Sequence, residues 1–327
     1  MTAIPEAKQP GAPEPRLIDL HPAAEPFLDA VLDGLSQDQK AIPSKFFYDR
    51  RGSELFDQIT RLDEYYPTRT EKALLKRFGP EIAERVGADA QLVEFGAGSA
   101  DKVRLLLAAL RDLSAYVAID ISRDFLFAEA VELQRAYPDL PVIAICADYT
   151  RRLDLPDTGH SRRVGLFPGS TIGNFSRPEA MRFLSTVRRM LEGGAFMVGV
   201  DLKKPTDLLN AAYNDAAGVT AAFNLNLLER ANRELGADFD LAGFEHLAFY
   251  NETEGQIEMH LRSLKPQQVT IAGRAFGFAQ GETIHTEISS KYAVDEFQEL
   301  ARAAGFNPAG VWVDDARLFS IHFLDSA

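Results

Sequence analysis

The amino-acid sequence predicts an α/β fold: a doubly wound, mostly parallel sheet with an inserted smaller α+β domain. From Gln91 to about residue 202, apolar strand-like runs alternate with amphipathic helical runs, which is typical of a parallel sheet with crossover helices. The first of these strands ends in a glycine turn that leads into a helix. After Lys204 the runs become short and alternate between apolar and polar residues, which indicates an antiparallel sheet with one solvated face.

The glycine turn lies in QLVEFGAGSADKVRLLLAAL, residues 91–110. An apolar strand ends at Phe95, Gly96 and Gly98 follow, and the next residues have the spacing of an amphipathic helix. Because glycine has no Cβ, backbone N–H groups and the positive helix N-terminus can approach a ligand closely. The turn therefore predicts a site for a nucleotide-like cofactor.

The remaining elements of the large sheet follow in order along the chain. Further strands are predicted over residues 115–120, 141–148, 163–170 and 194–202, with helices over 122–136 and 178–191. Residues 294–304 have helical spacing, and residues 310–324 contain two apolar runs that meet at Asp314–Ala316. We expect this last pair to be a hairpin that completes the sheet.

Other helices and strands are predicted before and after this sheet. Helices are expected over residues 23–36, after a cap at Ser53, and from a capping-box pattern at Thr68 and Glu71 to about Val86. A helical region over about 206–235 precedes antiparallel strands over 245–251, 255–264, 268–273 and 282–292. The resulting division is a flexible tail (1–17), a cofactor-binding domain (66–203 and 292–327) and a substrate-recognition domain (18–65 and 204–291).

Composition excludes several classes of partner. The net charge of −13 disfavours binding to DNA or RNA. No apolar run approaches the roughly 18 residues that span a bilayer, and the N-terminus lacks the pattern of a secretory signal. The single cysteine, Cys146, lies in an apolar run and is expected to be buried and inert. We expect a cytoplasmic monomer without a membrane or nucleic-acid partner.

Two acids at strand ends narrow the choice of cofactor. Asp120 follows the second strand, where a carboxylate can bind both ribose hydroxyls of an adenosine; this role also fits NAD. Asp148 follows the third strand and can accept a hydrogen bond from an adenine amino group. The loop G-A-G-S-A-D-K lacks the third glycine of a pyrophosphate-binding turn, and Asp101 would repel phosphates. The pattern favours a cofactor without phosphate, such as S-adenosylmethionine (SAM).

Other catalytic chemistries find no support in the spacing of residues. The six histidines show neither H-x-H nor H-E-x-x-H spacing, so we expect no metal site. There is no G-x-S-x-G elbow and no P-loop. The turn GSTIGN follows the fourth strand, where α/β enzymes place groups that face the substrate, and it ends in Asn174.

Several long and unusual blocks resemble the SAM-dependent histidine Nα-methyltransferases of ergothioneine biosynthesis. These blocks are KFFYD, GSELFDQITRLDEYYPTRTE, EFGAGSADK, GSTIGN, YNDAAGVTAAFN, IEMHLR and TEISSKY, between about residues 40 and 292. The resemblance implies a Rossmann-like methyltransferase fold with a second domain. It also implies three successive methylations of the α-amine of L-histidine, which give hercynine.

The resemblance implies a role for individual residues. Around SAM it implies Gly96, Gly98, Lys102, Asp120, Asp148 and Tyr149. Around the carboxylate and amine of histidine it implies Tyr65, Asn174 and Tyr213, with Tyr48 near the amine and Tyr48 and Asn174 as the catalytic pair. Around the imidazole it implies Met259, Glu287, Ile288 and Ser289. The chain departs from the family at His260, since an aromatic residue usually follows the methionine of IEM.

Three rival functions remain open from the sequence. A methyltransferase of the same fold could act on another amino acid or on an aromatic amine, although Glu287 is a poor neighbour for a purely apolar side chain. A non-catalytic SAM-binding protein would need no shaped polar pocket. An NAD-dependent oxidoreductase is disfavoured by the glycine loop.

Overall fold

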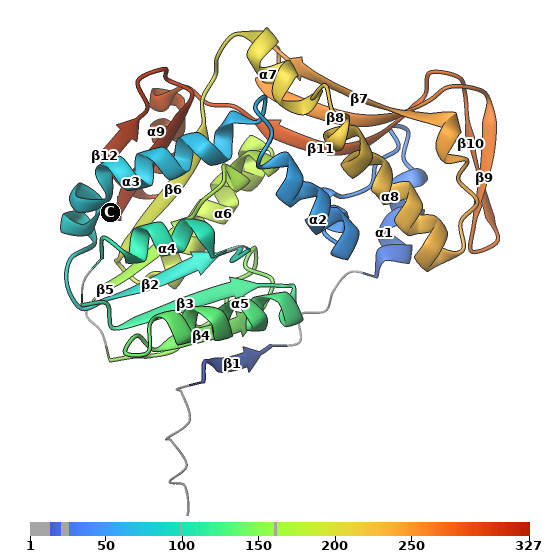
Figure 1. The fold of residues 1–327 in the computed structure, drawn as a ribbon. Helices are drawn as coiled ribbons and strands as arrows, with labels where there is room; N and C mark the ends of the chain where they lie inside the picture. The colour runs from blue at the N-terminus through green and yellow to red at the C-terminus, as the bar shows by residue number, and fades with distance from the viewer. Residues whose placement is uncertain (1–13, 21–25, 99, 111, 160–161) are drawn as a thin grey trace, which may run out of the picture.

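A computed structural model describes residues 14–20, 26–98, 100–110, 112–159 and 162–327, which form two lobes (Figure 1). The larger lobe contains the strands β1 Arg16–Asp19, β2 Ala90–Phe95, β3 Ala115–Asp120, β4 Val142–Cys146, β5 Arg162–Phe167, β6 Ala195–Asp201, β12 Phe306–Val313 and β13 Phe319–Ser326. They form one sheet in the order β1-β4-β3-β2-β5-β6-β13-β12. Strands β1 to β6 pair in parallel, whereas β13 is antiparallel to both β6 and β12. The chain therefore forms the predicted, mostly parallel sheet, with the C-terminal hairpin at one edge.

Helices cover both faces of this sheet. The helices on one face are α3 (Tyr66–Val86), α4 (Asp101–Leu107) and α5 (Arg123–Ala136), and those on the other are α6 (Arg177–Met190) and α9 (Val294–Ala303). Successive residues of a strand point to opposite faces, so Leu92 packs in one apolar cluster and Val93 in the other. This double layer explains why the strands read as continuous apolar runs. The doubly wound fold class is confirmed.

The smaller lobe combines the early helices with the segment between β6 and α9. It contains helices α1 (Phe27–Leu35), η1 (Ser44–Phe47), α2 (Arg50–Ile59), α7 (Thr206–Tyr213), α8 (Val219–Leu235) and η3 (Leu241–Gly243). Its strands are β7 (Phe244–Asn251), β8 (Gln256–Ser263), β9 (Gln267–Ile271), β10 (Arg274–Phe278) and β11 (Thr283–Ser290). Strands β11, β8 and β7 form a three-stranded antiparallel sheet, and β9 and β10 form a separate hairpin. Figure 1 shows α8 lying along this sheet, and Phe223, Leu227 and Leu228 of α8 pack in one core with Met259 and Leu261.

One irregularity in the small sheet decides which side chains share a face. His285 of β11 pairs with His260, but Glu287 pairs with Met259, so Thr286 is an extra residue in β11. Such a β-bulge shifts the alternation by one position. Glu287 therefore lies on the inner face with Met259, while His285 lies on the outer face with His260.

Several local predictions were wrong. Asp49, not Ser53, caps α2, since its Oδ1 accepts a hydrogen bond from the Gly52 backbone N–H at 2.7 Å. Helix α3 begins at Tyr66, two residues before the expected capping box, because Pro67 is placed well in a first helical turn. The expected helix over 206–235 is split into α7 and α8 around Gly218, which has a φ of 73°.

The N-terminal segment also differs from expectation. Residues 1–13 of the expected tail lie outside the described residues, but Arg16–Asp19 form β1 at the edge of the large sheet. These four residues pair in parallel with Ile143–Cys146, so their place is decided by a partner far along the chain. Strand β10 was also missed. No helix in the described ranges is long and apolar enough to cross a membrane.

Candidate active site

The glycine turn lies where the parallel strands of the large sheet end. Gly96 has a φ of 72°, which other residues rarely adopt, and a Cβ at this position would lie 3.4 Å from Cε1 of Tyr149. A Cβ on Gly98 would meet nothing within 4 Å among the described residues, so this side of the turn is open. Ser99 of the same turn lies outside the described residues. The turn is thus packed against Tyr149 at Gly96 and open at Gly98.

Asp120 and Asp148 flank the same edge. Burial raises the pKa of the Asp120 carboxyl, although its Oδ1 accepts a hydrogen bond from the Ser122 backbone N–H at 2.7 Å. Oδ1 of Asp148 accepts from the Thr150 backbone and hydroxyl at 3.0 and 2.6 Å. Burial first, and then both carboxylates, raise the pKa of Tyr149. The structure therefore brings these three side chains and the glycine turn together, as the sequence predicted.

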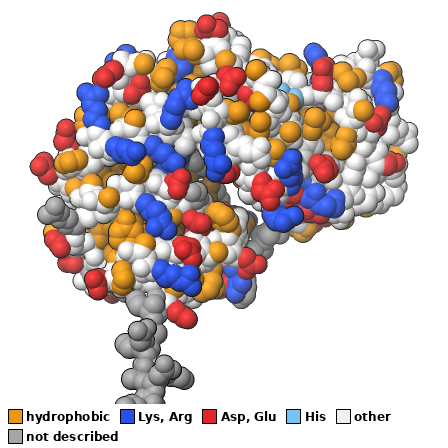
Figure 2. Space-filling view, viewed as in Figure 1, with side chains coloured by type: hydrophobic (Ala, Val, Ile, Leu, Met, Phe, Trp, Pro, Cys, Tyr) orange, Lys and Arg blue, Asp and Glu red, His pale blue; other side chains and the backbone are white. Residues whose placement is uncertain are grey.

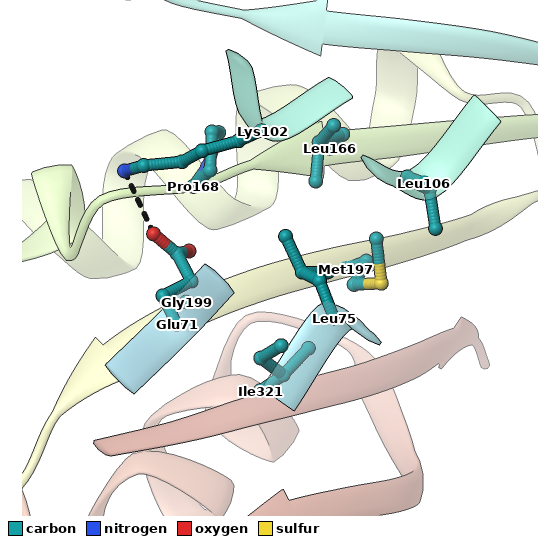
Figure 3. Close-up of a pocket in the computed structure, with 9 residues that line it drawn as sticks. All are labelled: Glu71, Leu75, Lys102, Leu106, Leu166, Pro168, Met197, Gly199 and Ile321. Carbon is teal, nitrogen blue, oxygen red and sulfur yellow. Dashed lines mark ion pairs between the residues drawn. The ribbon is translucent and has the colours of Figure 1, made fainter. Parts of the chain in front are cut away.

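Lys102 has a partner that the sequence did not reveal. Its Nζ lies 2.7 Å from Oε2 of Glu71, a residue of α3 that is only 2 % exposed (Figure 3). The Glu71 carboxylate also accepts hydrogen bonds at 2.9 Å from the backbone N–H of Gly169, in the loop after β5. Figure 3 shows Lys102 and Glu71 among the residues that line a small cavity, most of which have apolar side chains. Glu71 of α3 thus links Lys102, in the first turn of α4, to the loop after β5, and Glu71 is not the cap that was predicted.

The inner face of the small sheet carries the polar residues expected around an imidazole. Glu287 and Met259 are paired across β11 and β8, and Ser289 lies two residues beyond Glu287 on the same face. Among the described residues, no group donates a hydrogen bond to the Glu287 carboxyl. Burial raises its pKa to about 7, while the positive charge of Lys291 acts in the opposite direction. The side chain of Ile288 points to the opposite face, so only its backbone can contribute on this side.

A buried polar network lies behind Ser289. Nζ of Lys291 donates hydrogen bonds to the hydroxyls of Ser289 and Tyr213, at 2.8 and 3.1 Å, and lies 2.8 Å from Oδ2 of Asp201. Lys291 is 1 % exposed and Asp201 is fully buried. Asp201 also accepts hydrogen bonds from Tyr66 and Lys204. A buried charge pair with these hydrogen bonds fixes the orientation of both hydroxyls.

Asn174 reaches the same region from the large sheet. It ends the short helix η2 (Thr171–Asn174), which packs directly on β11. A Cβ on Gly173 would lie 2.9 Å from the Ser290 carbonyl oxygen and 3.3 Å from Oγ of Ser289. Glycine at this position therefore permits the close approach that places Asn174 beside the end of β11.

Tyr48 directly follows the helix η1, and Tyr65 directly precedes the helix α3. The Tyr48 ring is 41 % exposed, yet the surrounding protein desolvates its hydroxyl and raises its pKa well above the usual value, with Glu287 as the next cause. Asp120, at the cofactor edge, raises the pKa further. Tyr48 therefore lies between the two lobes, which are separated by a notch in the surface (Figure 2). Tyr65 packs edge-on against Tyr213, with ring centres 6.4 Å apart.

Sequence reasoning missed three residues that organise this site. Glu71, Asp201 and Lys291 are all buried, and each has partners in other elements of the chain, such as Gly169 for Glu71 and Tyr66 for Asp201. Asp201 directly follows the apolar run AFMVGV, whereas Glu71 and Lys291 stand beside polar residues and carry no local signal. Altogether, the arrangement offers an open glycine turn with two carboxylates on one lobe, a carboxylate and a hydroxyl on the other, and tyrosine and amide groups between them.

Comparison with known proteins now identifies the family. The profile described as "Histidine-specific methyltransferase, SAM-dependent" matches residues 27–326. The chain belongs to this family. Its activity is therefore SAM-dependent methyl transfer with specificity for histidine.

Two curated relatives cover nearly the whole chain. The Histidine N-alpha-methyltransferase of Mycolicibacterium smegmatis is 43 % identical over 91 % of this chain and 94 % of its own length. The enzyme of the same name from Mycobacterium tuberculosis is 41 % identical over 89 % of this chain and 92 % of its own. Among solved structures, an S-adenosylmethionine-dependent methyltransferase from Clostridium acetobutylicum is similar with a TM-score of 0.47 and 12 % identity, over 85 % of this chain and 98 % of that one.

Proposed function

We propose that the protein transfers three methyl groups from SAM to the α-amine of L-histidine and so forms hercynine, the step that belongs to ergothioneine biosynthesis. The observation that carries this proposal is the pair Glu287 and Ser289 on the inner face of the small sheet. A neutral imidazole has one N–H donor and one acceptor nitrogen. On one strand face, the Glu287 carboxylate can accept a hydrogen bond from the imidazole N–H, and the Ser289 hydroxyl can donate one to the other nitrogen.

Binding of the amino-acid part of the substrate is assigned to the groups between the lobes. Tyr65, Asn174 and Tyr213 can donate hydrogen bonds to the α-carboxylate, because each has a hydroxyl or amide donor. The Lys291 ammonium holds the Tyr213 hydroxyl from behind. Met259 is buried on the same face as Glu287 and supplies the apolar wall of the imidazole pocket.

The cofactor edge fits the adenosine of SAM. The open side of Gly98 leaves room for a ligand, and Asp120 and Asp148 supply carboxylate acceptors at the ends of two neighbouring strands. Tyr149 packs against Gly96 and can cover an aromatic base. Lys102 has three N–H donors, of which Glu71 uses one, so it can also bind the carboxylate of SAM. SAM supplies the electrophilic methyl group of its sulfonium.

Methyl transfer to the amine needs orientation more than acid–base chemistry. The reacting amine must be neutral, and an ordinary α-amine has a pKa of about 8. A carboxylate beside it would stabilise the ammonium form, whereas the uncharged groups of Tyr48 and Asn174 do not. The pKa of Tyr48 is raised, so its hydroxyl stays neutral and can position the amine lone pair at about 3 Å from the methyl carbon. A trimethylated amine has no lone pair, so the reaction stops after three transfers.

An amino-acid mixture incubated with SAM and the full chain tests this function. Mass spectrometry should show products with one, two and three added methyl groups on histidine alone. Methylation of another amino acid would support the first rival function, and the absence of any methylated product would support a non-catalytic SAM-binding protein.

The residue assignments need a separate binding test. Glu287→Ala should weaken histidine binding by about 1.5–3 kcal/mol, the usual worth of a charge-assisted hydrogen bond, and leave SAM binding unchanged. Calorimetry on both ligands measures this, and unchanged histidine affinity would remove Glu287 from the pocket. The cytoplasmic location, the monomeric state and the lack of nucleic-acid and membrane partners stay predictions from the sequence.

A further inference from the structure

The outer face of the small sheet carries a second cluster of polar residues, behind the proposed histidine pocket. Glu258 and His260 lie two residues apart on the central strand β8, and His285 pairs with His260 from β11. One nitrogen or oxygen from each of the three side chains lies within 4.8 Å of the others. Oε2 of Glu258 and Nε2 of His260 are 3.2 Å apart, and the two imidazole rings stack with centres 4.8 Å apart.

The β-bulge is what creates this cluster. In a regular strand His285 and Glu287 would share a face, whereas the extra Thr286 sends them to opposite faces. The bulge is fixed because the Thr286 hydroxyl, with its one hydrogen to donate, lies 2.8 Å from Oδ1 of Asn224 and 3.0 Å from the Met259 carbonyl oxygen. Two histidines are therefore held side by side by the fold.

Neighbouring groups orient the potential ligand atoms. Nε2 of His285 lies 3.1 Å from the Glu287 carbonyl oxygen, and because a carbonyl only accepts, Nε2 carries the hydrogen and Nδ1 keeps its lone pair. Oε1 of Glu258 accepts hydrogen bonds from the amides of Asn251 and Gln256, at 2.9 and 3.1 Å, which leaves Oε2 toward His260. Metal-binding histidines and carboxylates are typically held in this way by outer partners.

His260 is the most telling member of the cluster. It is only 8 % exposed, and its Nδ1 is buried without a hydrogen-bond partner among the described residues. Its ring stacks on Phe249, with centres 5.6 Å apart and an angle of 7° between the planes. A buried imidazole nitrogen without a partner is costly unless it binds something.

We propose that Glu258, His260 and His285 form a binding site for a divalent transition-metal ion, with Zn²⁺ as the probe of choice. Two imidazoles and one carboxylate are a ligand set that Zn²⁺ takes, with water in a further position. Ligand atoms about 2.1 Å from one ion lie at most about 4.2 Å apart, so a pair at the 4.8 Å limit closes by rotation of side chains. Because His285 is hydrogen-bonded to the Glu287 carbonyl, the ion would also brace the bulge that presents Glu287.

A competition titration of the full chain with a chromophoric chelator tests the site. Wild-type protein should bind one Zn²⁺ per chain and show a rise in melting temperature. His260→Phe keeps a ring stacked on Phe249 but removes the ligand, so it should lose at least about tenfold in affinity. Glu258→Gln keeps the side-chain shape and should lose a similar amount. Glu254→Gln, at an exposed position in the β7–β8 turn, is the matched control and should bind like wild type.

The outcomes separate the proposal from adventitious binding. Co²⁺ bound to the wild type should give the visible absorption of a site with imidazole ligands, and this spectrum should be lost in both cluster variants. The proposal is overturned if the wild type binds no Zn²⁺, or if both cluster variants bind it as tightly as Glu254→Gln. If His260→Phe fails to fold, Glu258→Gln alone decides. None of these readouts depends on methyltransferase activity, so the proposed function can fail without affecting them.

Discussion

Replacing Glu287 by glutamine should stabilise the ligand-free protein at alkaline pH and leave its stability at acid pH nearly unchanged. Burial raises the pKa of the Glu287 carboxyl from 4.5 to about 7. The folded protein therefore binds more protons than the unfolded chain between these two values. The stability of the wild type consequently falls as the pH rises from about 4.5 through about 7. Glutamine is neutral at every pH and does not contribute this loss.

The size of the effect follows from the two pKa values. They differ by about 2.5, and each pKa unit is worth about 1.4 kcal/mol, so the full loss is about 3.5 kcal/mol. Most of it should appear between pH 5 and pH 8, as an increase of about 2–3 kcal/mol in the stability difference between Glu287→Gln and wild type. The same substitution should weaken histidine binding, because the charged acceptor is lost.

Urea unfolding of both proteins without ligands, near pH 5 and near pH 8, measures this difference. Glu254→Gln serves as the control, since this glutamate is exposed in the turn between β7 and β8. A stability difference for Glu287→Gln that does not change with pH would refute the reasoning. It would mean that the carboxyl is solvated, and the proposed imidazole pocket would lose its desolvated acceptor.

Three further changes probe other parts of the site. Tyr48→Phe should lower kcat more than it raises KM for histidine, because the hydroxyl is assigned to orienting the amine; equal changes in both constants would contradict this. Gly173→Ala places a Cβ 2.9 Å from the Ser290 carbonyl oxygen and should reduce histidine affinity, measured by calorimetry, without changing SAM affinity. Lys291→Met leaves the buried Asp201 with fewer partners and should cost about 3–5 kcal/mol in urea unfolding; a cost below about 1 kcal/mol would show that Lys291 does not hold the network.

The sequence was sufficient to predict those strands and helices whose own residues show a strand-like or helical pattern of apolar side chains. The strands of the large sheet are buried on both faces, so each appears as a continuous apolar run, and the crossover helices show helical spacing. The glycine turn, Asp120 and Asp148 could be placed together because parallel strands end at one edge of a sheet. Strand β1 was missed because its four residues are identified only by pairing with β4.

The cluster of Glu258, His260 and His285 on the outer face of the small sheet could not be predicted for the same reason, since it depends on strand pairing. The absence of H-x-H and H-E-x-x-H spacing led to the expectation of no metal site, since such motifs are local. Glu258 and His260 are two residues apart, but His285 comes from a different strand, and its side of the sheet depends on the bulge at Thr286. No property of residues 285–287 taken alone reveals that alternation stops there.

The sequence by itself determined the fold class and, through its resemblance to a family, the kind of substrate. These depend on local periodicity and on blocks of neighbouring residues. Only the tertiary structure decided how Lys102 and Lys291 are used, since their partners Glu71 and Asp201 come from other elements. It also decided that Glu287 lies on the inner face with Met259 while His285 lies on the outer face, because the direction of a side chain on a strand follows from pairing register.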